Sequence, residues 1–125
     1  MYEAIQLISW SSNVLEYTCI DPACDSSSEN PRYRIYIELD EIPNIDNLDE
    51  YAKQFDDGLS KINPIYLSFR EKQSIGFPSL NIVKSGTFSN IRQDMINNGT
   101  GINQVKIPRV TRYENHIEIL QNSTI

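Results

Sequence analysis

The chain has 125 residues, of which 39% are hydrophobic and 22% charged, and its formal net charge is −6. This length and composition indicate a single globular domain and argue against a disordered segment. The acidic balance argues against a general nucleic-acid-binding or anionic-membrane-binding protein. No apolar run is long enough to span a membrane, and the first residues lack the pattern of a secretory signal. We therefore expect a cytoplasmic protein with no nucleic-acid or membrane partner.

The cysteine and histidine content limits redox and metal chemistry. Cys19 and Cys24 could close a small loop in an oxidising compartment, but without a secretory signal we expect two free thiols. His116 is the only histidine and there is no second cysteine pair, so a zinc site is not expected. Because Glu114 and Glu118 flank His116, we predict that this histidine lies at the surface.

Hydrophobic periodicity predicts one helix and two strands in the first third of the chain. Residues 2–12 follow one helical face, residues 14–19 are rich in β-forming side chains, and residues 32–39 alternate between apolar and polar. The loop between the two strands suggests that they pair antiparallel. The alternation predicts that the second strand has one covered face. The residues on that face are Tyr33, Ile35, Ile37 and Leu39.

The strongest helical pattern of the chain covers residues 45–62. Acidic residues lie in its first turns, where the helix dipole favours them. A second helix is predicted over residues 64–73, because Asn63 is a good N-cap and Pro64 suits the first helical position. The apolar side chains of the first helix, spaced three and four positions apart, are Ile45, Leu48, Ala52, Phe55, Leu59 and Ile62.

Tyr66 and Arg70 lie four positions apart on one face of this second helix. Such a pair can stack, bond a common partner, or simply extend its polar ends into solvent. The spacing by itself leaves these alternatives open.

The second half of the chain predicts a short strand over residues 80–83 and then a helix. This helix follows Gly86-Thr87 and ends at an Asn98-Gly99 cap. Residues 117–120 fit no element clearly. Together the elements predict an α+β fold, in which a small mixed β-sheet is covered by helices on one face.

Charge is distributed unevenly along the chain. Residues 38–57 contain eight acidic residues and one lysine, whereas residues 58–112 contain eight lysines and arginines against Glu71 and Asp94. The second half could face an anionic ligand while the first half keeps the protein soluble. A solvated acidic helix face beside an ordinary basic surface explains the same pattern, so charge alone does not decide.

Residues 103–109, with the sequence Asn-Gln-Val-Lys-Ile-Pro-Arg, offer a positive group on a stiffened loop. Pro108 fixes its own φ and pushes Ile107 towards extended geometry, so Lys106 is expected outside a helix. An ammonium group there could meet a phosphate or a developing negative charge. Short Lys/Pro/Arg stretches are also common on solvated loops, and no consensus phosphate-binding glycine pattern is present.

Several stretches, in order, resemble the C-terminal domain of the auxin-responsive acyl-acid–amido synthetases, a branch of the adenylate-forming enzymes with plant and bacterial members. The resemblance covers about residues 3–120 and is most specific in Gly86-Thr87-Phe88 and in the Gln-x-Lys-x-Pro-Arg pattern of residues 104–109. Residues 76–79 and Val105 depart from the usual family pattern, and we expect a bacterial-like member. The other matching stretches are Leu15-Glu16-Tyr17-Thr18, residues 33–39, Asn63-Pro64 with Tyr66 and Arg70, and Ser74-Ile75-Gly76.

This resemblance implies a function. Enzymes of the family use ATP and Mg²⁺ to convert a carboxylic acid into an acyl-adenylate, and the amine of an amino acid then attacks to give an amide. The resemblance implies that Lys106 is the catalytic lysine of the adenylation step. It also implies that Gln104, Lys106 and Arg109 lie at the bound nucleotide, with no metal ligand among them. For Arg109 we favour a structural role, in which it holds the loop through carboxylate or carbonyl bonds.

Residues 1–125 are therefore expected to be a single C-terminal (lid) domain. Nothing in them resembles the ATP- and acid-binding motifs of the family's large N-terminal domain, which we expect to be absent from this chain. That domain would be its partner, together with a carboxylic acid and an amino acid as substrates. The isolated chain is expected to fold without turning over. The alternative is a stand-alone binding or regulatory module of ferredoxin-like type, without catalysis.

Overall fold

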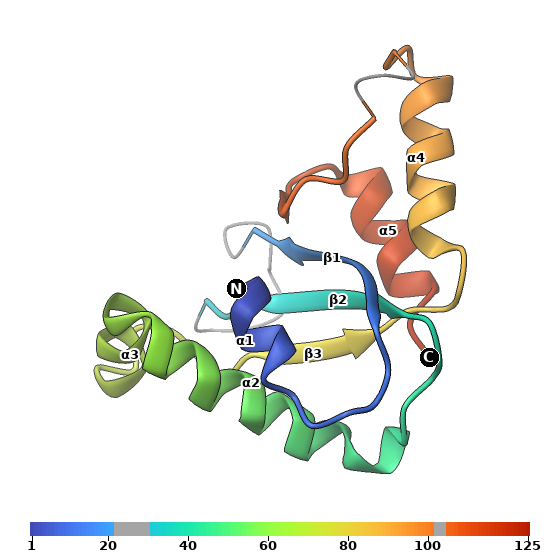
Figure 1. Ribbon diagram of the computed structural model, residues 1–125. Coiled ribbons are helices and arrows are strands. Elements are labelled where there is room, and N and C mark those ends of the chain that lie inside the picture. The colour runs from blue at the N-terminus through green and yellow to red at the C-terminus, as the bar shows by residue number, and fades with distance from the viewer. Residues whose placement is uncertain (22–30, 102–104) are drawn as a thin grey trace.

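A computed structural model describes residues 1–21, 31–101 and 105–125 of the chain. Its elements confirm the predicted α+β class with a small mixed sheet (Figure 1). In chain order they are α1 (Tyr2–Gln6), β1 (Val14–Ile20), β2 (Arg34–Leu39), the 3-10 helix η2 (Ile45–Asn47), α2 (Leu48–Ile62), α3 (Pro64–Glu71), β3 (Ser79–Ile82), α4 (Thr87–Asn97), β4 (Val110–Thr111) and α5 (Glu114–Asn122).

The sheet has the strand order β3-β2-β1-β4. β1 and β2 pair antiparallel, as predicted, with Cys19 opposite Ile35. β3 lies parallel to β2. The two-residue β4, which the sequence did not predict, lies parallel to β1. Between β3 and β4 the chain therefore passes from one edge of the sheet to the other. Helix α4 and residues 105–108, which we call the Lys106 segment, belong to this crossing.

Helices cover both faces of the sheet, so the prediction of a single covered face is wrong (Figure 1). One core contains Ile35 and Ile37 of β2 together with buried residues of α1, α2 and α3. The other contains Tyr36 of the same strand and buried residues of α4 and α5. Neighbouring strand residues point to opposite faces, so β2 contributes to two cores. Tyr36 shares its face of β2 with Arg34 and Glu38. Because these two neighbours are charged, the sequence pattern indicated that this face was exposed to solvent.

α2 buries the centre of its predicted apolar stripe against the sheet. Ile45 and Ile62 lie beyond the packed stretch and are exposed. α3 begins as predicted, since the side chain of Asn63 accepts hydrogen bonds from the N–H groups of Ile65 and Tyr66, with proline at the first helical position. The buried residues of the stripe are Ala52, Phe55 and Leu59.

α4 ends at the predicted Asn98-Gly99 cap. Gly99 has a φ of +94°, a conformation that glycine adopts without the steric cost of a Cβ atom. Its N–H donates to the carbonyl of Ile96, and the N–H of Thr100 donates to that of Met95, which is the Schellman pattern. This cap stops the helix shortly before the Lys106 segment.

The two terminal helices differ from the prediction. α1 ends at Gln6, although a helix was predicted up to residue 12, and the buried Ile8 follows it outside the helix. The ambiguous residues 117–120 lie inside α5. Across residues 1–21, 31–101 and 105–125, no helix has the length and apolar character needed to cross a membrane.

Candidate functional site

The Lys106 segment leads into β4, which pairs with β1 and forms one edge of the sheet (Figure 1). Lys106 is exposed, whereas its neighbour Ile107 is only 7% exposed and packs in the core under α4 and α5. As predicted from Pro108, Lys106 belongs to no helix. Gln104, the other residue implied at the nucleotide, lies outside the described residues.

Two hydrogen bonds from β1 to backbone carbonyls fix the chain directly after Lys106. The hydroxyl of Thr18 donates to the carbonyl of Pro108 at 2.6 Å. The N–H of Cys19 donates to the carbonyl of Arg109 at 2.9 Å. Because β1 is an inner strand of the sheet, these bonds hold the segment against one of the best-supported parts of the fold.

Arg109 makes the carboxylate and carbonyl contacts that were predicted for a structural role. Its Nη1 donates to a carboxylate oxygen of Glu16 and, at 2.9 Å, to the carbonyl of Tyr17. Its guanidinium carbon lies 4.3 Å from the centre of the Tyr17 ring, within the range of a cation–π contact. These contacts hold the side chain of Arg109 on β1, while its proposed contact with a nucleotide stays a prediction.

Half of the basic residues in the second half of the chain are paired with carboxylates of the domain itself. All four arginines of residues 58–112 contact a carboxylate. The pairs are Arg70–Asp56, Arg92–Glu16, Arg109–Glu16 and Arg112–Asp21. The four lysines of the same range form no ion pair with any residue that the structure describes. Among the described residues, Lys106 is therefore an exposed cation without an ion-pair partner.

Comparison with known proteins places this fold and segment in a family. A family model described as the GH3 family C-terminal domain matches residues 1–115. The chain belongs to the GH3 family, as its C-terminal domain. This confirms the resemblance that the sequence motifs suggested.

Similar proteins carry the GH3 domain within much longer chains. The domain is 30% identical over 125 residues to an Arabidopsis thaliana protein named indole-3-acetic acid-amido synthetase GH3.10, covering 98% of this chain and 20% of that protein. It is 24% identical over 119 residues to a Mus musculus GH3 domain-containing protein, covering 91% and 22% of the two chains. A solved structure of the GH3.15 acyl acid amido synthetase superposes with a TM-score of 0.80 at 26% identity, covering 99% of this chain and 23% of that one. The chain thus spans about a fifth of the length of these relatives.

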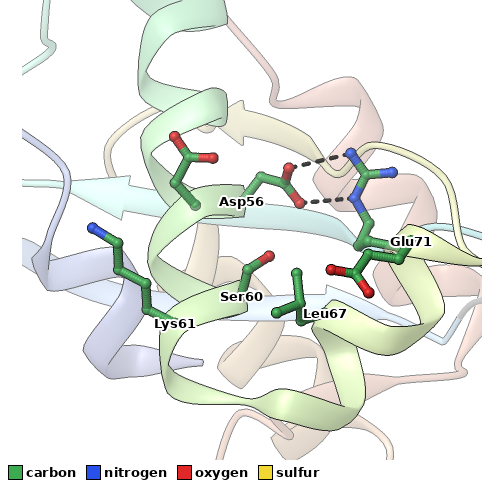
Figure 2. A pocket seen from close by; sticks show the side chains of 7 residues that line it. Asp56, Ser60, Lys61, Leu67 and Glu71 are labelled. Atoms are coloured by element: carbon green, nitrogen blue, oxygen red, sulfur yellow. Dashed lines mark hydrogen bonds and ion pairs between the residues drawn. The ribbon is translucent and has the colours of Figure 1, made fainter.

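A second cluster of polar side chains in the GH3 domain joins α2 and α3 (Figure 2). Asp56 accepts a 2.5 Å hydrogen bond from the hydroxyl of Tyr66, and Arg70 donates to both oxygens of the same carboxylate at 2.9 and 3.2 Å. Tyr66 and Arg70 therefore bond a common partner, which was one of the three predicted alternatives. Burial and the neighbouring carboxylate raise the pKa of the Tyr66 hydroxyl. Asp56 also lines an open hollow of about 520 Å³. Because both oxygens of its carboxylate already accept hydrogen bonds from Tyr66 or Arg70, Asp56 does not give this hollow an unpaired carboxylate.

His116 is buried, so its prediction as a surface residue is wrong. Its side chain is 8% exposed and its Nε2 lies 3.3 Å from a carboxylate oxygen of Asp94 in α4. The same oxygen accepts a hydrogen bond from Asn115 at 2.6 Å. Glu114 and Glu118 misled the prediction, because residues two positions away from His116 lie on the opposite side of a helix.

Proposed function

We propose that this GH3 domain is the C-terminal domain of an ATP-dependent acyl acid–amino acid ligase and that Lys106 is its catalytic lysine. The observation that carries the proposal is an exposed ammonium group that has no ion-pair partner among the described residues, on a segment that the protein anchors immediately beyond it. Family membership supports the same reading. In the proposed enzyme, a large N-terminal domain and the two substrates are the partners, and the protein is cytoplasmic.

The chemistry explains why a lysine suits this position. In the first half-reaction a carboxylate oxygen would bond to the α-phosphorus of ATP, and the bond from that phosphorus to pyrophosphate would break. Two anions must approach closely, and a nearby ammonium group offsets their repulsion and the charge that grows on phosphorus. In the second half-reaction the amine of an amino acid would attack the acyl carbon, lose a proton and release AMP. That step brings together a neutral amine and a mixed anhydride, so it depends less on Lys106.

The described residues include a cation that could contact a nucleotide phosphate, but no group of side chains that could bind its metal ion. Lys106 can reach outward to a phosphate, whereas Arg109 is already engaged by Glu16 and Tyr17. Within the described ranges, no three His, Cys, Asp or Glu side chains form a group that could hold a metal. We therefore propose that Mg²⁺ and most of ATP are bound by the large domain. Lys106, with Gln104 and Arg109 beside it, would contribute from this one.

A chimera tests the proposal. These 125 residues would replace the corresponding C-terminal region of the Arabidopsis thaliana relative, and the two half-reactions would be measured separately. Pyrophosphate release reports adenylation, and amide formation from supplied acyl-adenylate reports the second step. Lys106→Ala should reduce adenylation about 100- to 1,000-fold, the usual cost of removing one group that stabilises transition-state charge. Amide formation from supplied acyl-adenylate should change much less.

Lys72→Ala provides the matched control, because Lys72 is another exposed lysine, at the end of α3. It should leave both half-reactions unchanged. If Lys106→Ala leaves adenylation intact, the role of the lysine is wrong. If the folded chimera forms neither adenylate nor amide, a binding or regulatory module without catalysis becomes the better description. Such a module would not be ferredoxin-like, because the described helices and strands follow the order α-β-β-α-α-β-α-β-α, which does not contain the β-α-β-β-α-β order of that fold.

A further inference from the structure

One carboxylate of β1 accepts hydrogen bonds from two arginines distant in the chain and from the N–H of the next residue. Oε2 of Glu16 accepts from Nη2 of Arg92 at 2.8 Å, and Oε1 accepts from Nη1 of Arg109. Oε1 also accepts from the backbone N–H of Tyr17 at 3.1 Å. The side chain of Glu16 is only 15% exposed, so its contacts are better shielded from water than those of an ordinary surface ion pair.

The two arginines lie on either side of Lys106 in the chain. Arg92 belongs to α4, which precedes the Lys106 segment, and Arg109 follows that segment at the start of the edge pairing with β1. The chain is therefore attached to the carboxylate of Glu16 both before and after Lys106. With both arginines on Glu16, one carboxylate ties α4 and the chain beyond Lys106 to the same position of β1.

Glu16 is held in the sheet through β2, where it lies opposite Glu38. The pairing of β1 with β4 begins three residues further on, at Cys19. The ladder between β1 and β2 has an irregularity between Val14 and Glu16, where a strand changes its local direction. The ring of Tyr17 lies under the guanidinium of Arg109 and is itself stacked on the ring of Tyr2, with centres 5.7 Å apart. Arg109 is thus held between a carboxylate and an aromatic face.

We propose that Glu16 is a positioning residue for Lys106, acting through Arg109 and Arg92. This proposal rests on the proposed function and adds a residue to it. Without the carboxylate, the two guanidinium groups lose their shared counter-charge and the side chain of Arg109 is free to leave β1. The backbone at Lys106, three residues before Arg109, then gains freedom, and the ammonium of Lys106 no longer has a defined place to meet a phosphate.

The first experiment uses the chain by itself and needs no catalysis. Glu16→Gln should accelerate hydrogen exchange at the amide of Cys19, because that N–H donates to the carbonyl of Arg109 and reports whether the segment stays on β1. Asp21→Asn is the matched control, since it removes a carboxylate from an arginine located after β4. It should change exchange at Cys19 much less. Equal exchange in Glu16→Gln and the parent would overturn the proposal.

The second experiment uses the chimera and a double substitution. Glu16→Gln should reduce adenylation about 10- to 100-fold, the range expected when a reacting group is misplaced by about 1 Å. Amide formation from supplied acyl-adenylate should be nearly unchanged. In a Lys106→Ala background, Glu16→Gln should have almost no further effect on adenylation, because the group that it positions is gone.

The outcomes separate the two proposals. If Lys106→Ala is harmless, the proposed function fails whatever Glu16 does. If Lys106→Ala is severe and Glu16→Gln reduces adenylation by the same factor in both backgrounds, Glu16 does not act through Lys106 and only this inference fails. Loss of both half-reactions in Glu16→Gln would likewise indicate general structural damage and would overturn the positioning role.

Discussion

Cys19 is a buried thiol at the centre of the sheet, between the partners Ile35 on β2 and Val110 on β4. It is a free cysteine, as expected for this residue, while Cys24 lies outside the described residues. Burial raises the pKa of the Cys19 thiol to about 12. A thiolate is the reactive form of cysteine, so the folded chain keeps this group unreactive at neutral pH.

The raised pKa of Cys19 makes stability depend on alkaline pH. Between the ordinary value of 9.0 and the folded value of about 12, the folded chain keeps a proton that the unfolded chain loses. The free energy of unfolding should therefore fall as pH rises through this range, by at most about 1.4 kcal/mol per pH unit from this group. Below pH 9 this group should contribute no slope. Urea unfolding from pH 7 to 11 measures the effect.

Cys19→Ala should flatten that dependence between pH 9 and 10. Above pH 10 the raised pKa values of Tyr66 and Tyr33 act in the same direction, so Tyr66→Phe and Tyr33→Phe separate these contributions from that of Cys19. The assignment to Cys19 would be wrong if its replacement left the slope from pH 9 to 10 as steep as in the parent chain.

At the scale of the element, Glu38 of β2 joins the sheet to α4. The N-cap of α4 is Gly86, which has no side chain to cap the helix. The buried Glu38 instead accepts a 3.0 Å hydrogen bond from the N–H of Phe88 in the first turn. A carboxylate at this position also interacts favourably with the positive end of the helix dipole. A distant strand thus supplies the cap that the local sequence lacks.

Removing this carboxylate should destabilise the domain. Glu38→Ala leaves the N–H of Phe88 buried without its acceptor and should lower the free energy of unfolding by about 2 kcal/mol. Glu38→Gln keeps an acceptor but removes the charge, so its effect should be smaller. Asn63→Ala, which removes the local cap of α3, should cost about 1 kcal/mol and serves as a reference. Urea unfolding at pH 7 compares them, and a neutral Glu38→Ala would show that the bond does not stabilise α4.

The elements that were predicted well are those specified by adjacent residues. The stripe of α2, the Asn63-Pro64 start of α3 and the Gly99 end of α4 each depend on side chains within a few positions. β4 has only two residues and exists because it pairs with β1, so no local pattern marks it. In α5, the buried pair His116 and Leu120 has the four-residue spacing of a helix face, and this signal could have identified both the helix and the buried histidine.

At the scale of the whole molecule, two cores share one thin sheet. Ile37 is fully buried on the face covered by α2, and Ile91 of α4 is 2% exposed on the other. Because β2 contributes side chains to both cores, loss of the packing on one face removes support from the other. We therefore expect the domain to unfold as one cooperative unit.

Matched substitutions on the two faces test this cooperativity. Ile37→Val and Ile91→Val should each lower the free energy of unfolding by about 0.5–1.5 kcal/mol, the usual cost of deleting one buried methyl group. Both should shift the same single urea transition without changing its steepness. A second transition in either variant, or coincidence lost between fluorescence and circular dichroism, would mean that the two faces unfold separately.

The contacts of the whole fold determine how much of the candidate site could be predicted from the sequence. An exposed lysine on a loop after a helix follows from Pro108 and its neighbours, and the structure confirms that placement. Its anchorage could not be predicted, because Glu16 and Arg109 are 93 positions apart and meet only through the pairing of β4 with β1. Family motifs drew attention to both stretches, but only the folded chain shows that they touch.

In the second half of the described chain, the arginines are paired with carboxylates and the lysines are not. This difference predicts how the domain responds to ionic strength. Salt screens exposed charges over about 8 Å at physiological concentration, and it affects partly buried pairs much less. The attraction of the lysines for a polyanion should therefore weaken with salt well before the contacts that Asp56 and Glu16 make with their arginines. Changes in ionic strength should therefore alter the attraction of these lysines for an anion while leaving the architecture of the domain intact.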